Sequence, residues 1–207
     1  MKKHMVITIG RQYGSGGHQV ARELADLLGF KMYDKEIINM AAKESGISEE
    51  ILRVYDEKPT NSFLYSLSLG AYSFENSLIG TPSIPIVDRV FAAQAQIIKD
   101  LAEEGPCIFV GRCANSILKD RENVLSVFIH TDLERRIDRI CEYENISRNE
   151  ASSIIRNADK KRAGYYNYFS DLKWGDARSY DLCIDSRIGI ENVAEVIKLF
   201  IEHHNSL

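Results

Sequence analysis

The chain has 207 residues and a mass of 23.5 kDa, the size of one domain or of a core domain with small insertions. Hydrophobic residues make up 44% and charged residues 27%, ordinary globular values that exclude a fibrous or disordered chain. With 26 basic and 30 acidic residues the net charge is −4, so broad electrostatic binding to nucleic acid is not expected. No apolar run approaches the roughly 20 residues that span a bilayer, and the four cysteines lack metal-binding spacing. We therefore expect a cytoplasmic protein with reduced thiols, no membrane partner and no bound structural metal.

Short apolar segments alternate with amphipathic ones along the chain. The predicted elements, in chain order, are a strand at 5–9 stopped by Gly10, a helix at 20–28, a strand at 31–33, helices at 35–45 and 88–104, strands at 107–110 and 124–129, a weaker strand at 180–185 and a helix at 190–201. The runs at 107–110 and 124–129 are continuously apolar, as expected where a sheet is covered on both faces. This alternation predicts an α/β fold with a mainly parallel sheet.

Two further helices are marked by their first residues. Thr131-x-x-Glu134 and Ser147-x-x-Glu150 are capping boxes, in which the hydroxyl accepts from a backbone N–H and the Glu reaches back. We expect helices to begin at both positions.

Two segments break the alternation. Residues 57–85 are rich in Ser, Asn, Gly and Pro, and residues 156–178 are crowded with basic and aromatic side chains. In an α/β domain such segments are arms over a ligand site or plain insertions, and spacing alone does not separate the two.

A glycine-rich turn follows the first strand. It reads Gly10-Arg-Gln-Tyr-Gly-Ser-Gly-Gly-His18 and leads into a helix. In a strand, glycine turn and helix of this kind, successive backbone N–H groups and the helix N-terminus enclose a phosphate. The other interpretation is a tight turn without a ligand, but Gly14, Gly16 and Gly17 are more glycines than such a turn requires.

The turn departs from the phosphate-binding consensus G-x-x-x-x-G-K-[ST]. With Gly16 on the second consensus glycine, Arg11 stands at the first, Gly17 replaces the lysine, and His18 and Gln19 follow. The cradle is therefore present without its usual cation. Arg11 or a distant arginine is a candidate substitute, although a guanidinium is not equivalent to that lysine.

The order of several motifs resembles that of the cytidylate kinases, and in particular their divergent cytidylate kinase-like branch. The resemblance covers nearly the whole chain apart from residues 57–85. The motifs that carry it are Gly14-Ser-Gly-Gly-His-Gln-Val-Ala21, Leu27-Leu-Gly-Phe30, Tyr33-Asp34, Val110-Gly-Arg112, Asp159-Lys-Lys-Arg162, Arg162-Ala-Gly-Tyr-Tyr166 through Trp174, and Asp181-Leu-Cys-Ile-Asp-Ser186.

The resemblance implies a P-loop NTPase fold, a five-stranded parallel sheet flanked by helices within a single domain of residues 1–207. It also implies an acceptor-binding arm, placed at 57–87, and a lid at about 145–178. The implied reaction transfers the γ-phosphoryl of ATP, with Mg²⁺, to a pyrimidine nucleoside monophosphate. Such chemistry depends on positioning and positive charge rather than on a covalent nucleophile.

The resemblance also implies roles for individual residues. Arg112 corresponds to an arginine that binds the acceptor phosphate, with Cys113 in place of an aspartate. The residues implied to contact substrate are Asp34, Arg112, Asp159 and Arg162, and Arg156 lies one position from a lid arginine. Met40 stands where the family has an arginine on the acceptor phosphate, so this loss and that of the lysine both remove positive charge.

Other polar and aromatic residues have plainer interpretations. Tyr165, Tyr166, Tyr168, Phe169 and Trp174 either stack on a base or pack the lid against the sheet, and packing is favoured. The arginines at 135, 136 and 139, among acidic neighbours, are interpreted as solvated helix charges that pair four residues apart.

The leading hypothesis is a phosphotransferase of the cytidylate kinase-like type. The expected catalytic residues are Arg11, Arg112, Arg156 and Arg162, and the expected donor-binding residues are Gly14, Ser15, Gly16, Gly17, His18 and Gln19. A competing hypothesis is a sensor that binds a nucleotide or another phosphate ligand without transferring anything, which the missing lysine supports. A third keeps the kinase activity but changes the acceptor. The partners are small molecules in each case, and the oligomeric state stays open.

Overall fold

The computed structural model describes residues 4–34, 37, 40 and 85–204. Within this part, five strands form one sheet in the order β2-β3-β1-β4-β5, and each neighbouring pair is parallel. The strands are β1 (Val6–Arg11), β2 (Lys31–Tyr33), β3 (Cys107–Val110), β4 (Val124–His130) and β5 (Leu182–Asp185). The predicted α/β fold with a parallel sheet is confirmed.

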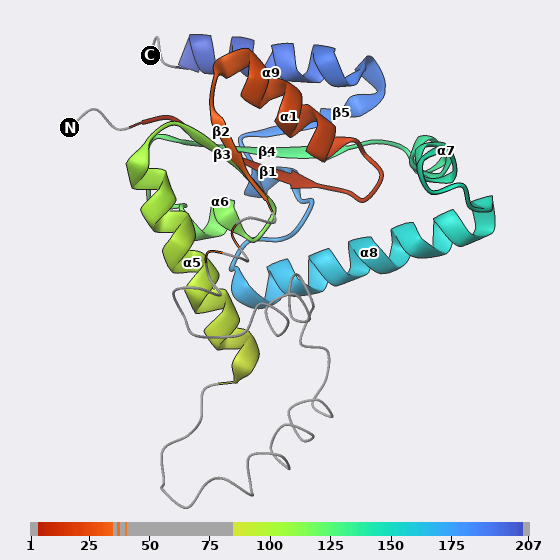
Figure 1. Cartoon of the computed structure of the whole chain (residues 1–207), viewed down its shortest axis with the longest axis horizontal. Coiled ribbons are helices and arrows are strands. Elements are labelled where there is room, and N and C mark those ends of the chain that lie inside the picture. Colours follow the sequence, from red (N-terminus) through yellow and green to blue (C-terminus); the bar gives the residue numbers. More distant parts are fainter. Residues whose placement is uncertain (1–3, 35–36, 38–39, 41–84, 205–207) are drawn as a thin grey trace, which may run out of the picture.

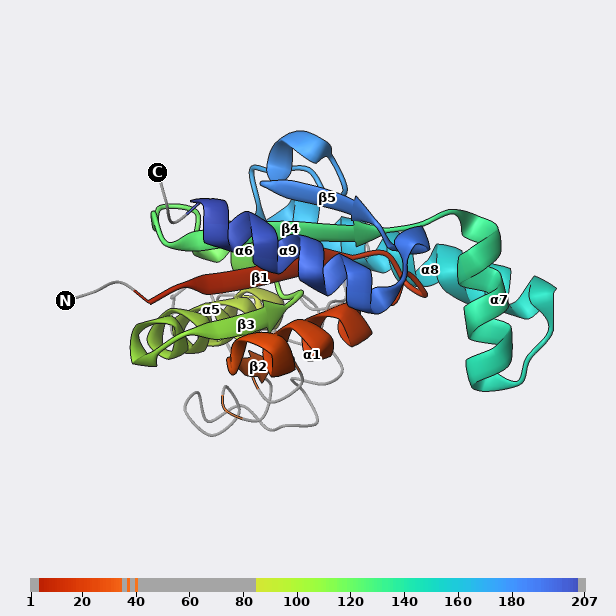
Figure 2. The same ribbon diagram turned by 90° about the horizontal axis from the view of Figure 1, so that it is seen from above.

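Helices cover both faces of the sheet (Figures 1 and 2). The described helices are α1 (Gly17–Leu28), α5 (Ile86–Glu104), α6 (Ala114–Ile117), α7 (Leu133–Glu144), α8 (Arg148–Phe169) and α9 (Ile190–His204), with 3₁₀ turns at Ala177–Ser179 and Ser186–Ile188. Helices α1 and α9 lie on one face, and α5, α6 and α8 lie on the other. Helix α7 lies beyond the carboxyl end of β4, so it is placed beside the turn that follows β1.

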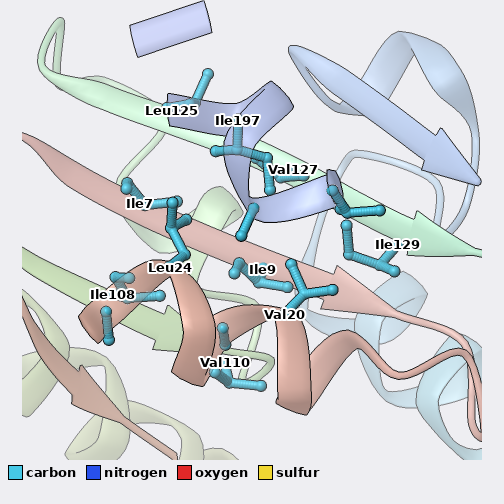
Figure 3. Packing of buried hydrophobic residues seen from close by; sticks show 14 of the residues in the cluster. Ile7, Ile9, Val20, Leu24, Ile108, Val110, Leu125, Val127, Ile129 and Ile197 are labelled. Atoms are coloured by element: carbon cyan, nitrogen blue, oxygen red, sulfur yellow. The ribbon is translucent and has the colours of Figure 1, made fainter. Parts of the chain in front are cut away.

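The core has one layer on each side of the sheet. Ile7 and Ile9 of β1 point toward α1 and α9, where they pack with Leu24 and Ile197 (Figure 3). Val6, one residue out of phase, belongs to the opposite cluster with α5. Because successive strand residues point to opposite faces and both faces are covered, the central strands carry mostly apolar side chains on both faces.

Strand β1 continues two residues beyond its predicted end at Ile9. Gly10 and Arg11 pair with Phe128 and Ile129 of β4, so Gly10 does not stop the strand. A Cβ at Gly10 would lie only 2.9 Å from the Phe128 ring. The residue is therefore a glycine because the ring packs closely against its backbone. The extension matters because it fixes the main chain of Arg11 at the carboxyl end of the central strand.

The two predicted capping boxes have different outcomes. Ser147 caps α8, because its side chain accepts from the backbone N–H of Glu150. The prediction that Thr131 caps α7 is wrong, because Asp132 is the cap and accepts from the N–H of Arg135 at 3.0 Å. Thr131 lies directly after β4, is only 5% exposed and does not provide the cap.

Some predicted segments lie outside the described residues. They are most of the helix at 35–45 and almost all of the arm at 57–87. Among the described helices, none combines the length and the hydrophobicity that a membrane span requires. The four cysteines are not joined in disulfides.

Candidate functional site

The site is built around the glycine turn, residues 12–16, between β1 and α1. Gly14 and Gly16 have φ of 76° and 81°, in the left-handed region that favours glycine. Ser15 is fully buried, and its hydroxyl donates to the Gln12 carbonyl at 2.9 Å. The Ser15 carbonyl accepts from the Ser186 hydroxyl at 2.7 Å, which ties the turn to the end of β5.

The first turn of α1 is not closed by a capping side chain. Its N-cap residue is Gly16, which offers no side-chain hydrogen bond to the first helical amides. The four N-terminal N–H groups of a helix lack intrahelical partners, and together with the helix dipole they favour an anion. The local geometry is therefore that of a phosphate cradle.

A cavity of about 570 Å³, here called the turn cavity, opens over the glycine turn. Residues from α1, the ends of β1, β2 and β3, and helices α7 and α8 line it. The predicted site residues among its lining are Arg11, Gly14, Gly16, Gly17, His18, Gln19, Asp34, Arg112 and Arg162. Ser15 lies in the wall of the turn, fully buried.

A second, water-sized cavity of about 20 Å³ adjoins the ends of β1 and β3. We call it the aromatic cavity, because Tyr165, Tyr166, Trp174 and Tyr180 line it. Three arginines line both cavities and so mark their junction: Arg11, Arg112 and Arg162.

Arg112 is brought to this junction by a distorted loop after β3. Gly111, Arg112 and Cys113 have φ of 77°, 58° and 56°, and the latter two are non-glycine residues in a left-handed conformation. Each such residue costs about 1–2 kcal/mol, and strain of this kind gathers at functional sites. The loop turns the Arg112 side chain inward, where only 4% of it is exposed.

Asp34 is the acidic neighbour of this arginine. Since β2 and β3 are adjacent and parallel, Asp34 and Arg112 emerge at the same edge, with Nη2 of Arg112 3.6 Å from Oδ1 of Asp34. Nε2 of His18 lies 3.5 Å from the other carboxylate oxygen. Burial lowers the pKa of Arg112 to about 10, Asp34 opposes this shift, and the nearby charge of Arg11 adds to it.

Arg162 reaches the junction from α8. Its Nη1 donates to the carbonyl of Arg11 at 3.4 Å, and its guanidinium lies over the Tyr13 ring, 5.3 Å from the centroid. Helix α8 therefore supplies a cation to the carboxyl end of β1, although Arg162 and Arg11 are more than 100 residues apart in the sequence.

Two arginines of α7 belong to the site although the sequence interpretation made them solvated helix charges. Arg139 donates to the carbonyl of Gly14 at 2.6 Å and lines the turn cavity. Arg136 is buried, pairs with Asp159 and donates to the carbonyl of Tyr13. That interpretation is wrong for both. Their helical spacing with Ile140 and Tyr143 was a signal that these residues share one face of α7, and the structure shows that this face meets the turn cavity.

The match to known families agrees with this geometry. The family model described as "Cytidylate kinase-like family" matches residues 6–188. The chain belongs to the cytidylate kinase-like family. It is 28% identical to the cytidylate kinase of Methanothrix thermoacetophila over 184 residues, 88% of each chain. It is also 27% identical to the cytidylate kinase of Pyrococcus abyssi, over 96% of this chain and 94% of that one.

Solved structures support the fold. An uncharacterized protein from Eubacterium ventriosum has a TM-score of 0.72 and 27% identity, with 96% of this chain and 99% of that chain covered. Shikimate kinase from Acinetobacter baumannii has a TM-score of 0.52 at 15% identity, covering 98% and 96% of the two chains, and shows likeness of fold alone. The P-loop kinase fold expected from the cytidylate kinase resemblance is confirmed.

The cytidylate kinase resemblance implies roles for two residues that lie away from both cavities. Arg156 is exposed on α8, where it donates to the hydroxyl of Ser152. Asp159 accepts from the backbone N–H of Tyr13 at 2.7 Å and from Arg136. The substrate-binding and catalytic roles implied for these two residues remain predictions. Met40 is exposed.

The aromatic residues of this cytidylate kinase-like chain mostly pack, as predicted. Tyr165 and Tyr166 are 3% and 5% exposed, and they form a cluster with Cys113 to which Phe169 and Trp174 are joined. The Trp174 ring also meets Phe128 edge-on. Tyr168 is the exception, because half of it is exposed.

Proposed function

We propose that the chain transfers the γ-phosphoryl group of Mg-ATP to a pyrimidine nucleoside monophosphate, CMP or dCMP. The observation that carries this proposal is the position of Arg11, Arg112 and Arg162 at the junction of the two cavities. A transferring phosphoryl group spreads negative charge over its oxygens, and pre-positioned cations stabilise that charge. The named activity of the archaeal relatives, cytidylate kinase, supports the choice of acceptor.

The donor side fits a nucleoside triphosphate. The left-handed glycines keep side chains away from the turn, and the uncapped start of α1 offers its amides to the phosphates of ATP. Gly14, Ser15, Gly16, Gly17, His18 and Gln19 are the proposed donor-binding residues. Arg139 joins them, since its guanidinium already lies at the turn.

Magnesium fits here as a partner of the phosphates. No cluster of three or more metal-ligating side chains occurs among residues 4–34, 37, 40 and 85–204. Mg²⁺ keeps several waters and is commonly bound through substrate phosphates with one or two carboxylates, and Asp34 lines the turn cavity. The ion supplies charge neutralisation when bound with ATP.

The acceptor side is proposed to use Arg112 and Arg162. Each is held by the fold before substrate arrives, Arg112 by its buried loop and Arg162 by Arg11 and Tyr13. A planar guanidinium binds phosphate through two parallel hydrogen bonds, so a pair of them orients the acceptor for in-line attack. The arm at 57–87 and the lid at about 145–178 remain proposed parts of this side.

A second candidate function is a nucleotide sensor on the same fold. Gly17 favours it, because the residue that normally contacts the β- and γ-phosphates is missing. The sensor binds ATP with saturation and forms no product.

Release of ADP from Mg-ATP across a panel of nucleoside monophosphates separates the two functions. We expect release with CMP, dCMP or UMP and a loss of about a hundredfold to a thousandfold in Arg112→Ala, because removal of one transition-state donor costs that much in other enzymes. Arg135→Ala is the matched control, since Arg135 is exposed and pairs with Asp132 away from both cavities.

Two results contradict the proposal. Saturable ATP binding without release for any monophosphate selects the sensor or a different acceptor. Full turnover by a folded Arg112→Ala protein removes Arg112 from the site.

A further inference from the structure

Gly17 is a glycine for reasons of space. Its φ does not lie in the left-handed region, since the described residues with positive φ include Gly14 and Gly16 but not Gly17. A Cβ added at Gly17 would lie 2.5 Å from the Cβ of Arg11 and 3.1 Å from its Cγ. Contacts below 3.0 Å force a shift, and these two atoms belong to the inflexible base of the arginine side chain.

The Arg11 main chain has little freedom to move aside. It pairs with Ile129 in the sheet, and its carbonyl accepts from Arg162. The same added Cβ at Gly17 would lie 3.4 Å from the Cβ of Ile129. Arg11 therefore occupies the space that any side chain at position 17 needs.

The charged end of Arg11 lies on the substrate side. The residue lines both cavities, and its charge contributes to the lowered pKa of Arg112, so the two guanidinium groups are near each other. Arg11 thus brings a positive charge to the junction of the two cavities, beside the glycine turn.

We infer that Arg11 and Gly17 have exchanged the residues of the phosphate-binding consensus: the cation stands at the first position and the glycine at the lysine position. In the consensus, the first position is a glycine, which has no Cβ, and the lysine stands six residues later. The contact between positions 11 and 17 in this chain indicates that such a glycine leaves room for the lysine side chain. Here the arginine fills that room and supplies the charge to the donor phosphates. The inference rests on the proposed function, because it takes ATP phosphates as the anion at the turn.

A double-mutant cycle tests the exchange through Arg11→Gly, Gly17→Lys and the double variant. The first readout is the melting temperature of the ligand-free proteins. We expect Gly17→Lys to lower it by several degrees in the wild-type background and to leave it nearly unchanged in the Arg11→Gly background. Gly17→Ala in both backgrounds repeats this comparison with the smallest Cβ, in case the lysine variant does not fold.

The second readout is the dissociation constant of Mg-ATP by calorimetry. We expect Arg11→Gly to weaken binding at least tenfold and the double variant to recover most of that loss. Arg135→Ala is the control for the loss of one positive charge, and it should bind ATP like the wild type.

The outcomes separate this inference from the proposed function. Equal melting-temperature losses for substitutions at 17 in both backgrounds overturn the exchange. ATP binding that is unchanged in Arg11→Gly, or not recovered in the double variant, also overturns it while leaving the proposed function in place. A wild-type protein that binds no ATP overturns both.

Discussion

The positively charged side chain of Arg112 is buried, and burial disfavours its charged form. Its pKa falls to about 10, mainly through desolvation, so the guanidinium stays charged at neutral pH. Asp34 compensates part of the cost, and Arg11 increases it by repulsion. An anion between these groups offsets the burial cost. This arrangement favours the proposed binding of a phosphate at the expense of the stability of the site.

Arg139 shows how a single contact connects α7 to the glycine turn, the proposed donor side. Nη1 of Arg139 donates to the Gly14 carbonyl at 2.6 Å, and Arg139 also lines the turn cavity. We predict that Arg139→Ala weakens Mg-ATP binding by about tenfold, which corresponds to about 1.4 kcal/mol. Calorimetry against Arg135→Ala, from the exposed side of the same helix, checks this. Equal ATP affinities in the two variants would contradict it.

At the scale of elements, α7 and α8 are joined to each other and to the glycine turn. Ile137 and Ile140 of α7 pack with Ala151 and Ile155 of α8. Asp159 then links three segments, because it accepts from Tyr13 in the turn and from Arg136 in α7. A helix expected to act as a lid is thus connected to the glycine turn, the proposed donor site, through one carboxylate.

The Asp159 contacts lead to a prediction that differs from a direct role in substrate binding. Asp159→Asn keeps an acceptor for the Tyr13 amide but leaves Arg136 without its anionic partner. We expect a loss of about 3 kcal/mol in the free energy of unfolding, as for other buried pairs broken on one side. Urea titration measures this loss, and steady-state kinetics give the KM values for ATP and the acceptor. A rise in acceptor KM with unchanged stability would instead support the substrate contact that the family resemblance implies.

Prediction from sequence succeeded best where burial alone decides the structure. The apolar runs at 107–110 and 124–129 are strands because both sheet faces are covered, and that requirement is visible in composition. The prediction of the α7 cap failed because both Thr131 and Asp132 have side chains that can cap a helix. The position at which β4 ends decides which of them faces the helix. Arg136 and Arg139 were missed because periodicity defines a helical face without saying what that face meets.

At the scale of the whole molecule, we predict that alkaline pH lowers the free energy of unfolding because the Cys107 thiol is buried. Burial raises the pKa of this thiol from 9.0 to about 12. Above pH 9 the unfolded chain therefore loses a proton that the folded protein keeps, and the free energy of unfolding falls by up to about 1.4 kcal/mol per pH unit. This contribution is fully present below pH 9 and is lost as the pH rises toward 12.

Urea unfolding between pH 8 and 10.5 checks the Cys107 prediction. Cys107→Ala should show a shallower fall in stability over this range than the wild type, while tyrosines and Arg112 titrate alike in both proteins. Parallel curves for the two proteins would show that Cys107 does not contribute.

The whole fold places the ends of β1, β2 and β3 at one edge, which gathers Arg11, Asp34 and Arg112 from distant parts of the sequence. The parallel sheet predicted from the sequence accounts for this arrangement, since parallel strands present their carboxyl ends together. The contribution of α8 was predicted in part: Arg162 reaches the junction, whereas Arg156 points to solvent. Six residues, fewer than two helical turns, separate the two positions, and only the packing of α8 distinguishes them.

The most direct test of the central claim is the fate of the γ-phosphoryl group itself. The protein is incubated with CMP and Mg-ATP carrying a radioactive γ-phosphate, and CDP, inorganic phosphate and ATP are separated by chromatography. The account predicts label in CDP, lost in Arg112→Ala and retained in Arg135→Ala. Label that stays in ATP, or appears only in inorganic phosphate, would contradict phosphoryl transfer to CMP.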